Sequence, residues 1–259
     1  MARQLHNAVL PRRTMAARLL ALPRSLAWAA GALAATLGFG TIGLAVALFL
    51  RPHYRYHLFV RWSFFIIWWA RVTCGIRWVV EGEDHIPRQP CIIMCKHQSA
   101  WETLAMQFWF TPQTWVLKKE LTRIPFIGWA LSLLSPIAID RSARKRAMEQ
   151  MLEQGMQRLQ DGYWVIVFPE GTRVPAGTTG RYQRGGAVLA SEANRPILPI
   201  AHNAGEFWPR NSFLKYPGTV HVRMGPVIEP AGRDPELVLA EVKAWIEVNT
   251  RAISEADRS

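Results

Sequence analysis

The sequence predicts an α/β protein in which a mixed β-sheet of about seven strands is flanked by helices and preceded by an N-terminal membrane-associated helical segment. Two observations predict this class. The chain opens with an apolar, purely basic segment, and seven short apolar runs alternate with helical patterns after it. We therefore divide the chain into a membrane anchor, residues 1–75, and a folded domain, residues 76–259.

The positive charge is concentrated in the N-terminal segment. The chain carries a formal net charge of +12. Residues 1–77 hold ten Arg and no Asp or Glu, whereas residues 78–259 hold 21 Lys and Arg against 19 Asp and Glu. A nucleic-acid-binding protein would carry its excess charge on a folded polar face. Here the charge accompanies Trp residues and long apolar runs, which favours an anionic membrane surface over nucleic acid as the partner.

Residues 25–50 contain no charged side chain. As a helix they would extend about 39 Å at 1.5 Å per residue, enough to cross a bilayer with some tilt. A cleaved signal peptide is the alternative. The run is longer than an ordinary signal h-region, and Arg51 and Arg55 follow it closely, so we expect a retained membrane segment.

A second apolar block, residues 57–70, contains Arg61 and three Trp. This mix is typical of an interfacial or re-entrant helix. Five Arg precede the first run and five more follow it before Trp78, so charge favours both flanks on the same side of the membrane. We therefore expect a hairpin, with its bend at Gly38 and Gly40.

Seven short apolar runs in the folded domain are typical of β-strands. The expected strands are Arg77–Val80, Cys91–Cys95, Thr114–Leu117, Pro136–Ile139, Trp164–Phe168, Ile197–Ala201 and Val220–Met224. Two helical patterns are clear among them. Ser142–Gln160 carries an apolar stripe and ends at Asp161-Gly162. Pro235–Ala252 follows Asp234, an N-cap residue, with Pro235 at the first helical position.

The three cysteines, Cys74, Cys91 and Cys95, predict no disulfide framework. Cys91 and Cys95 flank an apolar run, so we expect them to be buried and unreactive. No second Cys/His pair lies at a spacing that would complete a metal site, and we expect no bound metal.

His97 and Glu102 are the first candidate catalytic residues. An apolar strand runs directly into His97, and a carboxylate follows five residues later. An imidazole can take a proton from an attacking alcohol, and a carboxylate on its other nitrogen fixes the tautomer. Five residues is not a same-face spacing on a helix. We therefore expect His97 at a strand–helix turn and Glu102 in the first helical turn, reaching back. A satisfied structural histidine is the alternative.

Two further motifs follow predicted strands. In Phe168–Arg173, Gly171 can bring backbone amides close to an anion, Thr172 can donate a hydrogen bond, and Arg173 can grip a phosphate. A strand-ending turn with a solvated arginine is the alternative. Ile139-Asp140-Arg141 also ends a strand with a cation. Ligands of open α/β sheets bind beyond the carboxyl ends of the strands. These motifs therefore indicate an acid–base centre beside a phosphate cradle.

A fourth block, Ile197–Asn203, completes an ordered set that resembles the glycerophospholipid acyltransferase family, in particular its 1-acylglycerol-3-phosphate acyltransferases. That family carries His-x4-Asp, a strand ending in Arg, Phe-Pro-Glu-Gly-Thr-Arg, and then an apolar strand with Pro. The resemblance covers about residues 76–226 and implies the family's glycerolipid acyltransferase fold.

The resemblance also implies roles for individual residues. His97 would be the general base and Glu102 its orienting acid. The substrate's phosphate site would be formed by Arg141, Glu170, Gly171, Thr172 and Arg173, with Lys119 and Arg184 as accessory cations. Glu102 stands where the family has Asp, and Gln183-Arg184 stands where it has a basic pair. The Gly- and Thr-rich segment 174–180 is typical of a mobile loop.

The activity implied by the resemblance is transfer of a fatty acyl group from acyl-coenzyme A or acyl-acyl carrier protein to the sn-2 hydroxyl of 1-acyl-sn-glycerol-3-phosphate. No metal or other cofactor is expected, because the thioester is already activated. No Gly-x-Ser-x-Gly elbow is present, which argues against a serine hydrolase. The alternatives are another lyso-lipid acceptor, such as a lyso-ornithine lipid, and a non-catalytic membrane-anchored lipid-binding protein. The expected location is a bacterial inner membrane, with the catalytic domain on the cytoplasmic side.

Overall fold

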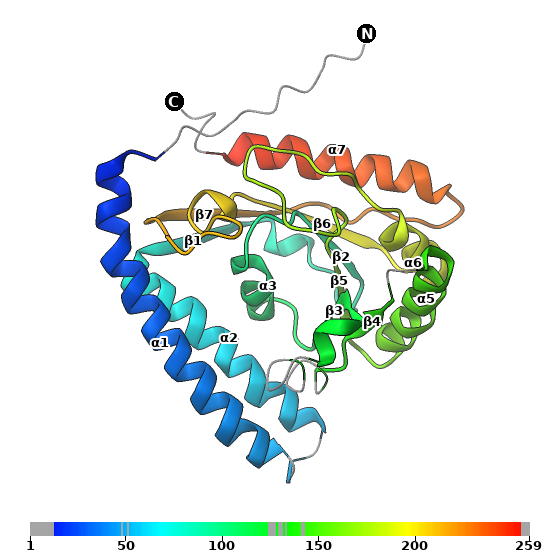
Figure 1. Ribbon diagram of the computed structural model, residues 1–259. Coiled ribbons are helices and arrows are strands. Elements are labelled where there is room, and N and C mark those ends of the chain that lie inside the picture. Colours follow the sequence, from blue (N-terminus) through cyan, green and yellow to red (C-terminus); the bar gives the residue numbers. More distant parts are fainter. Residues whose placement is uncertain are drawn as a thin grey trace.

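The computed structural model describes residues 13–47, 49–50, 52–123, 128, 132, 134–140 and 143–254. All seven predicted strands are present in one sheet, which confirms the α/β class (Figure 1). The strands are β1 (Ile76–Glu81), β2 (Ile92–Cys95), β3 (Gln113–Lys118), β4 (Ile137–Ile139), β5 (Trp164–Val167), β6 (Ile197–His202) and β7 (Gly218–Met224).

The spatial order of the strands is β1-β7-β6-β2-β5-β3-β4. Only the β6–β7 pair is antiparallel, and every other neighbouring pair is parallel. The five strands from β6 to β4 therefore point the same way. Their carboxyl ends share one edge of the sheet.

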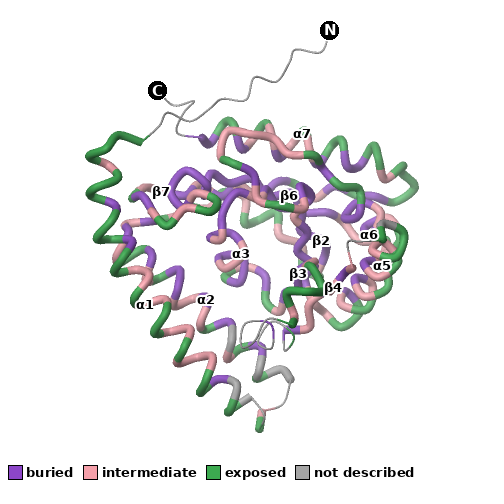
Figure 2. The backbone as a smooth tube through the Cα atoms, in the orientation of Figure 1, coloured by how far each residue is buried: buried purple, intermediate pink, exposed green. Residues whose placement is uncertain are grey.

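The centre of the sheet is buried on both faces, which is why its strands read as continuous apolar runs rather than alternating ones. In β2, Ile93 and Cys95 pack in one core cluster, and Ile92 and Met94 pack in the other. Figure 2 shows the buried strands enclosed by helices. The first cluster includes residues of α2 (Pro52–Cys74) and α3 (Trp101–Ala105), and the second includes residues of α5 (Arg144–Gln160), α6 (Gly185–Ala193) and α7 (Pro235–Ile253).

The helix ends agree closely with the sequence pattern. At the start of α7, Asp234 Oδ1 accepts a hydrogen bond from the N–H of Glu236 at 2.9 Å, so Asp234 is the predicted N-cap. Helix α5 ends at Gln160 as predicted and begins at Arg144, two residues later than expected. Short 3-10 helices complete the domain: η1 (Glu83–His85), η2 (Met106–Phe108), η3 (Lys119–Arg123) and η4 (Ala204–Glu206).

Helices α1 (Met15–Ala47) and α2 form an antiparallel hairpin along one side of the molecule (Figure 1). Indole N–H groups join them: Trp62 Nε1 donates to Thr36 Oγ1 at 3.1 Å, and Trp69 Nε1 donates to the carbonyl of Ala27 at 3.1 Å. The expected bend at Gly38 and Gly40 is wrong. Helix α1 continues through both glycines, because glycine lowers helix propensity by only about 1 kcal/mol without removing a backbone hydrogen bond.

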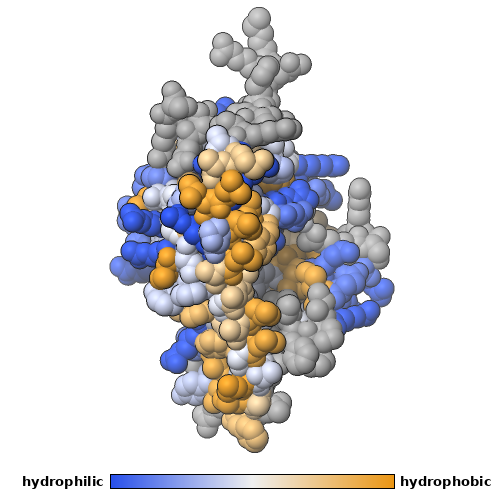
Figure 3. Space-filling view, turned by 60° about the vertical axis from the view of Figure 1, so that its left-hand side comes forward, coloured by the Kyte–Doolittle hydropathy of each residue, from blue (hydrophilic) through white to orange (hydrophobic). Residues whose placement is uncertain are grey.

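The outer face of α1 is apolar and exposed. Within Met15–Gly43, an 18-residue stretch has a mean hydropathy of 1.4, and only 6% of that stretch is buried. In Figure 3 these side chains form a hydrophobic stripe along the length of α1. A core helix of similar composition would be largely buried, so α1 is a candidate membrane segment by its length and composition.

A buried lysine fixes the first half of α1 to the domain. Lys215 Nζ lies 3.6 Å from the ring centroid of Trp28 and 4.7 Å from that of Trp208. The backbone N–H of Lys215 donates to Ser25 Oγ at 2.9 Å. Burial lowers the pKa of Lys215 to about 8. The hairpin is therefore joined to the folded domain by specific polar and aromatic contacts.

Candidate active site

The candidate site lies where the carboxyl ends of β6, β2 and β5 meet, with β2 in the middle. His97 follows β2, the Phe168–Arg173 turn follows β5, and His202 ends β6. This is the sheet edge at which open α/β proteins bind their ligands. The topology thus brings together motifs that are about 70 to 105 residues apart in the chain.

The predicted contact between His97 and Glu102 is present. His97 Nδ1 lies 2.9 Å from Glu102 Oε1. The same oxygen accepts the backbone N–H groups of Gln98 at 2.9 Å and Ser99 at 2.8 Å. Glu102 lies in the first turn of α3, and its carboxylate reaches back to cap the turn that carries His97. This capping explains why a spacing of five residues brings the two side chains together.

The imidazole of His97 is held on one face and open at one nitrogen. It stacks on the ring of Phe168, with centroids 4.0 Å apart and planes 16° from parallel. Its side chain is 13% exposed. Nδ1 donates to Glu102, and Nε2 makes no hydrogen bond with any residue that the structure describes. The lone pair of the neutral ring therefore lies on Nε2, which can accept a proton.

Glu102 is fully buried between two histidines. Burial acts to raise the pKa of Glu102, but the contacts with His202 and His97 outweigh it, and this pKa lies below its usual value. Glu102 Oε2 lies 3.9 Å from His202 Nε2 and has no hydrogen-bond partner among the described residues. The carboxylate is therefore ionised and suited to stabilise a protonated His97.

His202 is a structural neighbour of this pair. Its Nε2 donates to the carbonyl of Lys96 at 2.7 Å, and its Nδ1 accepts the N–H of Ala204 at 3.2 Å. Burial lowers the pKa of His202 below its usual value. The ring is thus neutral, with its proton on Nε2, and it fixes the backbone directly before His97.

The Phe168–Arg173 turn brings the backbone that follows Arg173 into contact with that of His97. Gly171 adopts a φ of +67°, which favours glycine, and its N–H donates to the carbonyl of Phe168 at 2.9 Å. The N–H of Val174 donates to the carbonyl of His97 at 2.8 Å. Arg173 therefore directly precedes a residue that is hydrogen-bonded to His97. Arg173 Nε is buried and has no hydrogen-bond partner among the described residues, and Thr172 is exposed.

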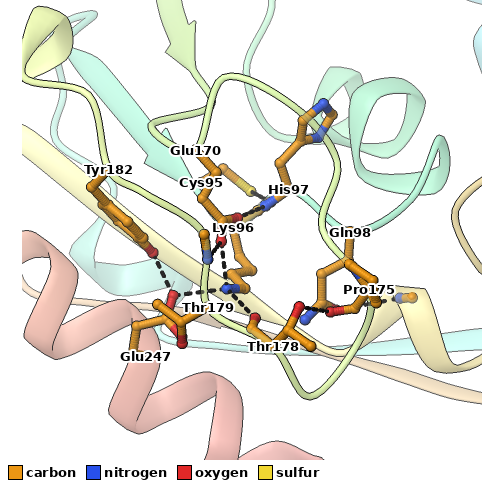
Figure 4. A network of polar contacts seen from close by, with 12 residues as sticks. Cys95, Lys96, His97, Gln98, Glu170, Pro175, Thr178, Thr179, Tyr182 and Glu247 are labelled. Atoms are coloured by element: carbon orange, nitrogen blue, oxygen red, sulfur yellow. Dashed lines mark hydrogen bonds and ion pairs between the residues drawn. The ribbon is translucent and has the colours of Figure 1, made fainter. Parts of the chain in front are cut away.

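Glu170 points into the protein interior rather than toward the open side of the turn (Figure 4). Its Oε1 accepts Lys96 Nζ at 2.8 Å and the N–H of Gly180 at 2.8 Å, and its Oε2 accepts the N–H of His97 at 3.1 Å. A carboxylate in this position would also repel a phosphate. Glu170 therefore supports the backbone of the site, which differs from the direct substrate contact that the resemblance implied.

The segment 174–180, in which composition suggested a mobile loop, is hydrogen-bonded to the rest of the site at several points. Lys96 Nζ donates to the carbonyl of Thr178 at 3.0 Å, and Thr179 Oγ1 donates to Glu247 Oε2. Together with the Val174 and Gly180 contacts, these bonds hold the segment against β2 and α7.

Two of the remaining predicted cations, Lys119 and Arg184, take no part in these contacts. Lys119 is exposed at the start of η3, after β3, which is two strands from β2 in the sheet. Arg184 is exposed at the start of α6, with its Nη1 3.9 Å from Glu236 Oε1. Arg141 lies outside the residues that the structure describes.

Lys96 and Glu247 are site residues that sequence reasoning missed. Lys96 is completely buried beneath the turn, although its position directly after a fully apolar strand could have marked it as a buried cation in need of a partner. Nothing in the sequence pairs it with Glu247, which lies 151 residues away in α7.

A family model described as Acyltransferase matches residues 77–203, from β1 to just beyond β6. This range contains the His97–Glu102 pair and the Phe168–Arg173 turn at one sheet edge. The protein is therefore an acyltransferase.

Curated relatives narrow the class. A 1-acyl-sn-glycerol-3-phosphate acyltransferase of Pseudomonas aeruginosa is 46% identical over 220 residues, which cover 83% of this chain and 86% of the relative. The human 1-acyl-sn-glycerol-3-phosphate acyltransferase alpha is 32% identical over 64% of this chain and 60% of its own length. The chain belongs to the 1-acyl-sn-glycerol-3-phosphate acyltransferase family, as its four sequence blocks predicted.

A solved structure supports the fold over nearly the whole chain. The crystal structure of the 1-acyl-sn-glycerophosphate (LPA) acyltransferase from Thermotoga maritima superposes with a TM-score of 0.75, covering 92% of this chain and 99% of that one. Its sequence identity is 21%, so the likeness is one of architecture.

Proposed function

We propose that this acyltransferase moves a fatty acyl group from an acyl thioester to the sn-2 hydroxyl of 1-acyl-sn-glycerol-3-phosphate, giving phosphatidic acid. The thioester carrier is coenzyme A or acyl carrier protein. The names of the curated relatives support the acceptor. The observation that carries the mechanism is the 2.9 Å contact between His97 Nδ1 and Glu102 Oε1, which leaves Nε2 as a base at the open side of the ring.

In this mechanism, His97 Nε2 takes the proton of the acceptor hydroxyl as its oxygen attacks the thioester carbonyl carbon. The ionised Glu102 stabilises the imidazolium that forms. The tetrahedral intermediate then expels the thiolate, which receives the proton from His97. The products are an ester and a free thiol, so His97 returns to its starting state. The thioester is already activated, and the reaction needs no metal or covalent enzyme intermediate.

Arg173 is the proposed partner of the acceptor's phosphate. A guanidinium binds phosphate through paired, charge-assisted hydrogen bonds. The buried Arg173 Nε that lacks a protein partner is available for such a bond. The backbone bond from Val174 to His97 keeps this cation and the base on adjacent segments. Phosphate binding at Arg173 would therefore bring the neighbouring glycerol hydroxyl toward His97.

The α1–α2 hairpin is the proposed membrane anchor. The exposed apolar stripe of α1 supports insertion into a bilayer, where the lipid acceptor is found (Figure 3). The start of α1 and the end of α2 both lie beside the sheet (Figure 1), which supports having both flanks on one side of the membrane. We place the catalytic domain on the cytoplasmic side of a bacterial inner membrane.

The general-base role is tested with His97→Ala. The variant should lose thiol release from the acyl thioester by at least ~10²-fold, because the hydroxyl is no longer deprotonated. The exposed His85 in η1, whose Nδ1 lies 3.0 Å from the carbonyl oxygen of Met224, offers a matched control, His85→Ala. Near-normal turnover by a folded His97→Ala variant would contradict the mechanism.

The acceptor is tested with Arg173→Ala and a panel of lyso-lipids. Loss of a charge-assisted bond should raise the acceptor KM roughly 10- to 100-fold and leave the donor KM unchanged. The exposed Arg181, in Arg181→Ala, is the control. Equal turnover of an acceptor without phosphate, such as a lyso-ornithine lipid, would assign the enzyme to another acceptor class.

A further inference from the structure

Lys96 lies on the opposite side of the β2 strand end from the catalytic histidine. Successive residues of an extended strand point to opposite faces, so His97 faces α3 while Lys96 continues the face of Ile92 and Met94, toward α7. The Lys96 side chain is completely buried, with Nζ 2.8 Å from Glu170 Oε1 and 2.7 Å from Glu247 Oε1 (Figure 4).

The ammonium of Lys96 lies within hydrogen-bond distance of two carboxylates, although a single carboxylate would neutralise it. A second ammonium, that of Lys243, lies farther away, 5.7 Å from the ring centroid of Tyr182. Glu247 also accepts Tyr182 OH at 2.7 Å and Thr179 Oγ1, so donors surround both of its oxygens. Burial and the neighbouring Glu247 carboxylate raise the pKa of Tyr182, which keeps its proton and donates it. A buried ion pair adds little net stability, and a surplus carboxylate adds a desolvation cost. Stability alone therefore does not account for Glu247.

The cluster joins the parts of the site that must hold a fixed geometry. Glu170 Oε2 holds the N–H of His97, while its Oε1 holds the N–H of Gly180. Lys96 Nζ holds the carbonyl of Thr178, and Glu247 holds the hydroxyl of Thr179. The segment that follows Arg173 is thereby attached at one end to His97 and at the other to helix α7.

We propose that Glu247 and Lys96 are positioning residues of the acyl transfer: together they fix the loop that carries Arg173 against His97, and so set the distance between the bound acceptor phosphate and the base. This inference rests on the proposed role of Arg173 in the function above. A displacement of about 1 Å between substrate and catalytic group can cost up to about 10²-fold in rate, so the cluster contributes to catalysis without touching substrate.

The test uses Glu247→Gln in the full-length protein. Gln keeps the size of the side chain and removes its charge. The acceptor KM should rise roughly ten-fold and kcat should fall, while the donor KM stays unchanged, because the loop shifts relative to His97. The melting temperature should change little, because Lys96 and Glu170 remain paired. Glu241→Gln, which breaks an exposed ion pair with Arg233 on the same helix, is the matched control.

The same change is then made in an Arg173→Ala background. If the cluster acts through the Arg173 loop, Glu247→Gln should add no further rise in acceptor KM there.

Unchanged kinetics for Glu247→Gln, or an equal loss for donor and acceptor together with a lower melting temperature, would overturn the positioning role. An Arg173→Ala single variant with a normal acceptor KM would overturn the proposed phosphate contact and the positioning role together. A raised KM in that variant with a silent Glu247→Gln would overturn the positioning role alone.

Discussion

Glu102 lies between two imidazole rings that differ in what they can do. His202 has both nitrogens engaged by the backbone, at the carbonyl of Lys96 and the N–H of Ala204. His97 has only Nδ1 engaged, by Glu102. Proton exchange with a substrate is therefore open to His97 alone, while His202 keeps the strand end in place. The hydrogen bonds of the two histidines therefore suit His97 to the proposed catalytic role and His202 to a structural one.

The structural role of His202 predicts a pH dependence of stability. Burial lowers the pKa of His202 below its usual 6.5, so the unfolded chain binds a proton that the folded protein does not. The contribution of His202 to the free energy of unfolding is therefore fully present above pH 6.5, and it is lost as the pH falls below that value. Thermal unfolding at pH 7.5 and 5.5 should show that wild type loses about 1 kcal/mol more than His202→Gln, which has no group to titrate.

The exposed His85 provides the comparison for that measurement. A His85→Gln variant, which makes the same substitution at an exposed histidine of η1, is measured beside it as the matched control. Parallel slopes for wild type and His202→Gln would show that His202 is not held neutral by the fold.

At this scale, local patterns in the sequence were enough to predict the His97–Glu102 contact. A strand end, a histidine and a carboxylate in the next helical turn are adjacent in the chain, so backbone geometry alone brings them together. The Lys96–Glu247 contact depends on where α7 packs, and that is decided by burial of its apolar face rather than by any local signal. The direction of Glu170 was missed for the same reason, because its partner Lys96 lies 74 residues away.

The elements themselves were largely predictable. Strands buried on both faces give short apolar runs, and Asp234-Pro235 marks the start of α7 by its chemistry. The order of the strands in the sheet was not predictable. All the strands are similar short apolar runs, so the sequence pattern does not show which strand pairs with which. The bend in α1 was assigned to Gly38 and Gly40, yet the chain reverses later, before Pro52, which begins α2. Proline fits the first position of a helix, where no backbone N–H partner is lost.

Two glycines of α1 differ in the space around them: Gly31 packs against α2, and Gly38 does not. This difference gives a prediction for the hairpin. A Cβ at Gly31 would lie 2.1 Å from Trp69 Nε1, and that indole is held by its bond to Ala27. A Cβ at Gly38 meets nothing within 4 Å. Gly31→Ala should therefore destabilise the protein by about 1–3 kcal/mol through overpacking. Gly38→Ala should be neutral or stabilise by up to about 1 kcal/mol through helix propensity.

Thermal unfolding of both variants in one detergent checks this prediction. Opposite shifts of the melting temperature are expected from the same chemical change in the same helix. Equal shifts would mean that α1 and α2 do not pack through the Gly31–Trp69 contact in solution.

Across the whole molecule, net positive charge and exposed apolar surface are concentrated in the N-terminal region. The ten arginines without a carboxylate lie in the first 77 residues, together with the exposed apolar face of α1, while the rest of the chain is nearly neutral. A sheet enclosed on both faces needs no such apolar surface for its own stability. The stripe in Figure 3 is therefore suited to lipid, and the flanking arginines to anionic headgroups.

This division predicts that membrane binding and catalysis can be separated. Leu33 and Leu37 are 61% and 59% exposed on one face of α1. A Lys at the centre of a membrane helix costs about 2.5–3.5 kcal/mol. Leu33→Lys with Leu37→Lys should therefore shift the protein from vesicles to the soluble fraction in a flotation assay. Turnover of an acceptor embedded in vesicles should fall, while turnover of a short-chain, water-soluble acceptor should be kept, because the His97 site is unaltered.

Leu237, at the start of α7, is 63% exposed and supplies the control. Leu237→Lys adds one such charge to helix α7, outside the α1 stripe, so partition between vesicles and solution should not change. If the double variant stays fully bound to vesicles, the α1 stripe is not the membrane-binding surface. If it loses turnover of both acceptors equally while remaining folded, the hairpin instead takes part in forming the catalytic site, because the two functions would then depend on the same residues.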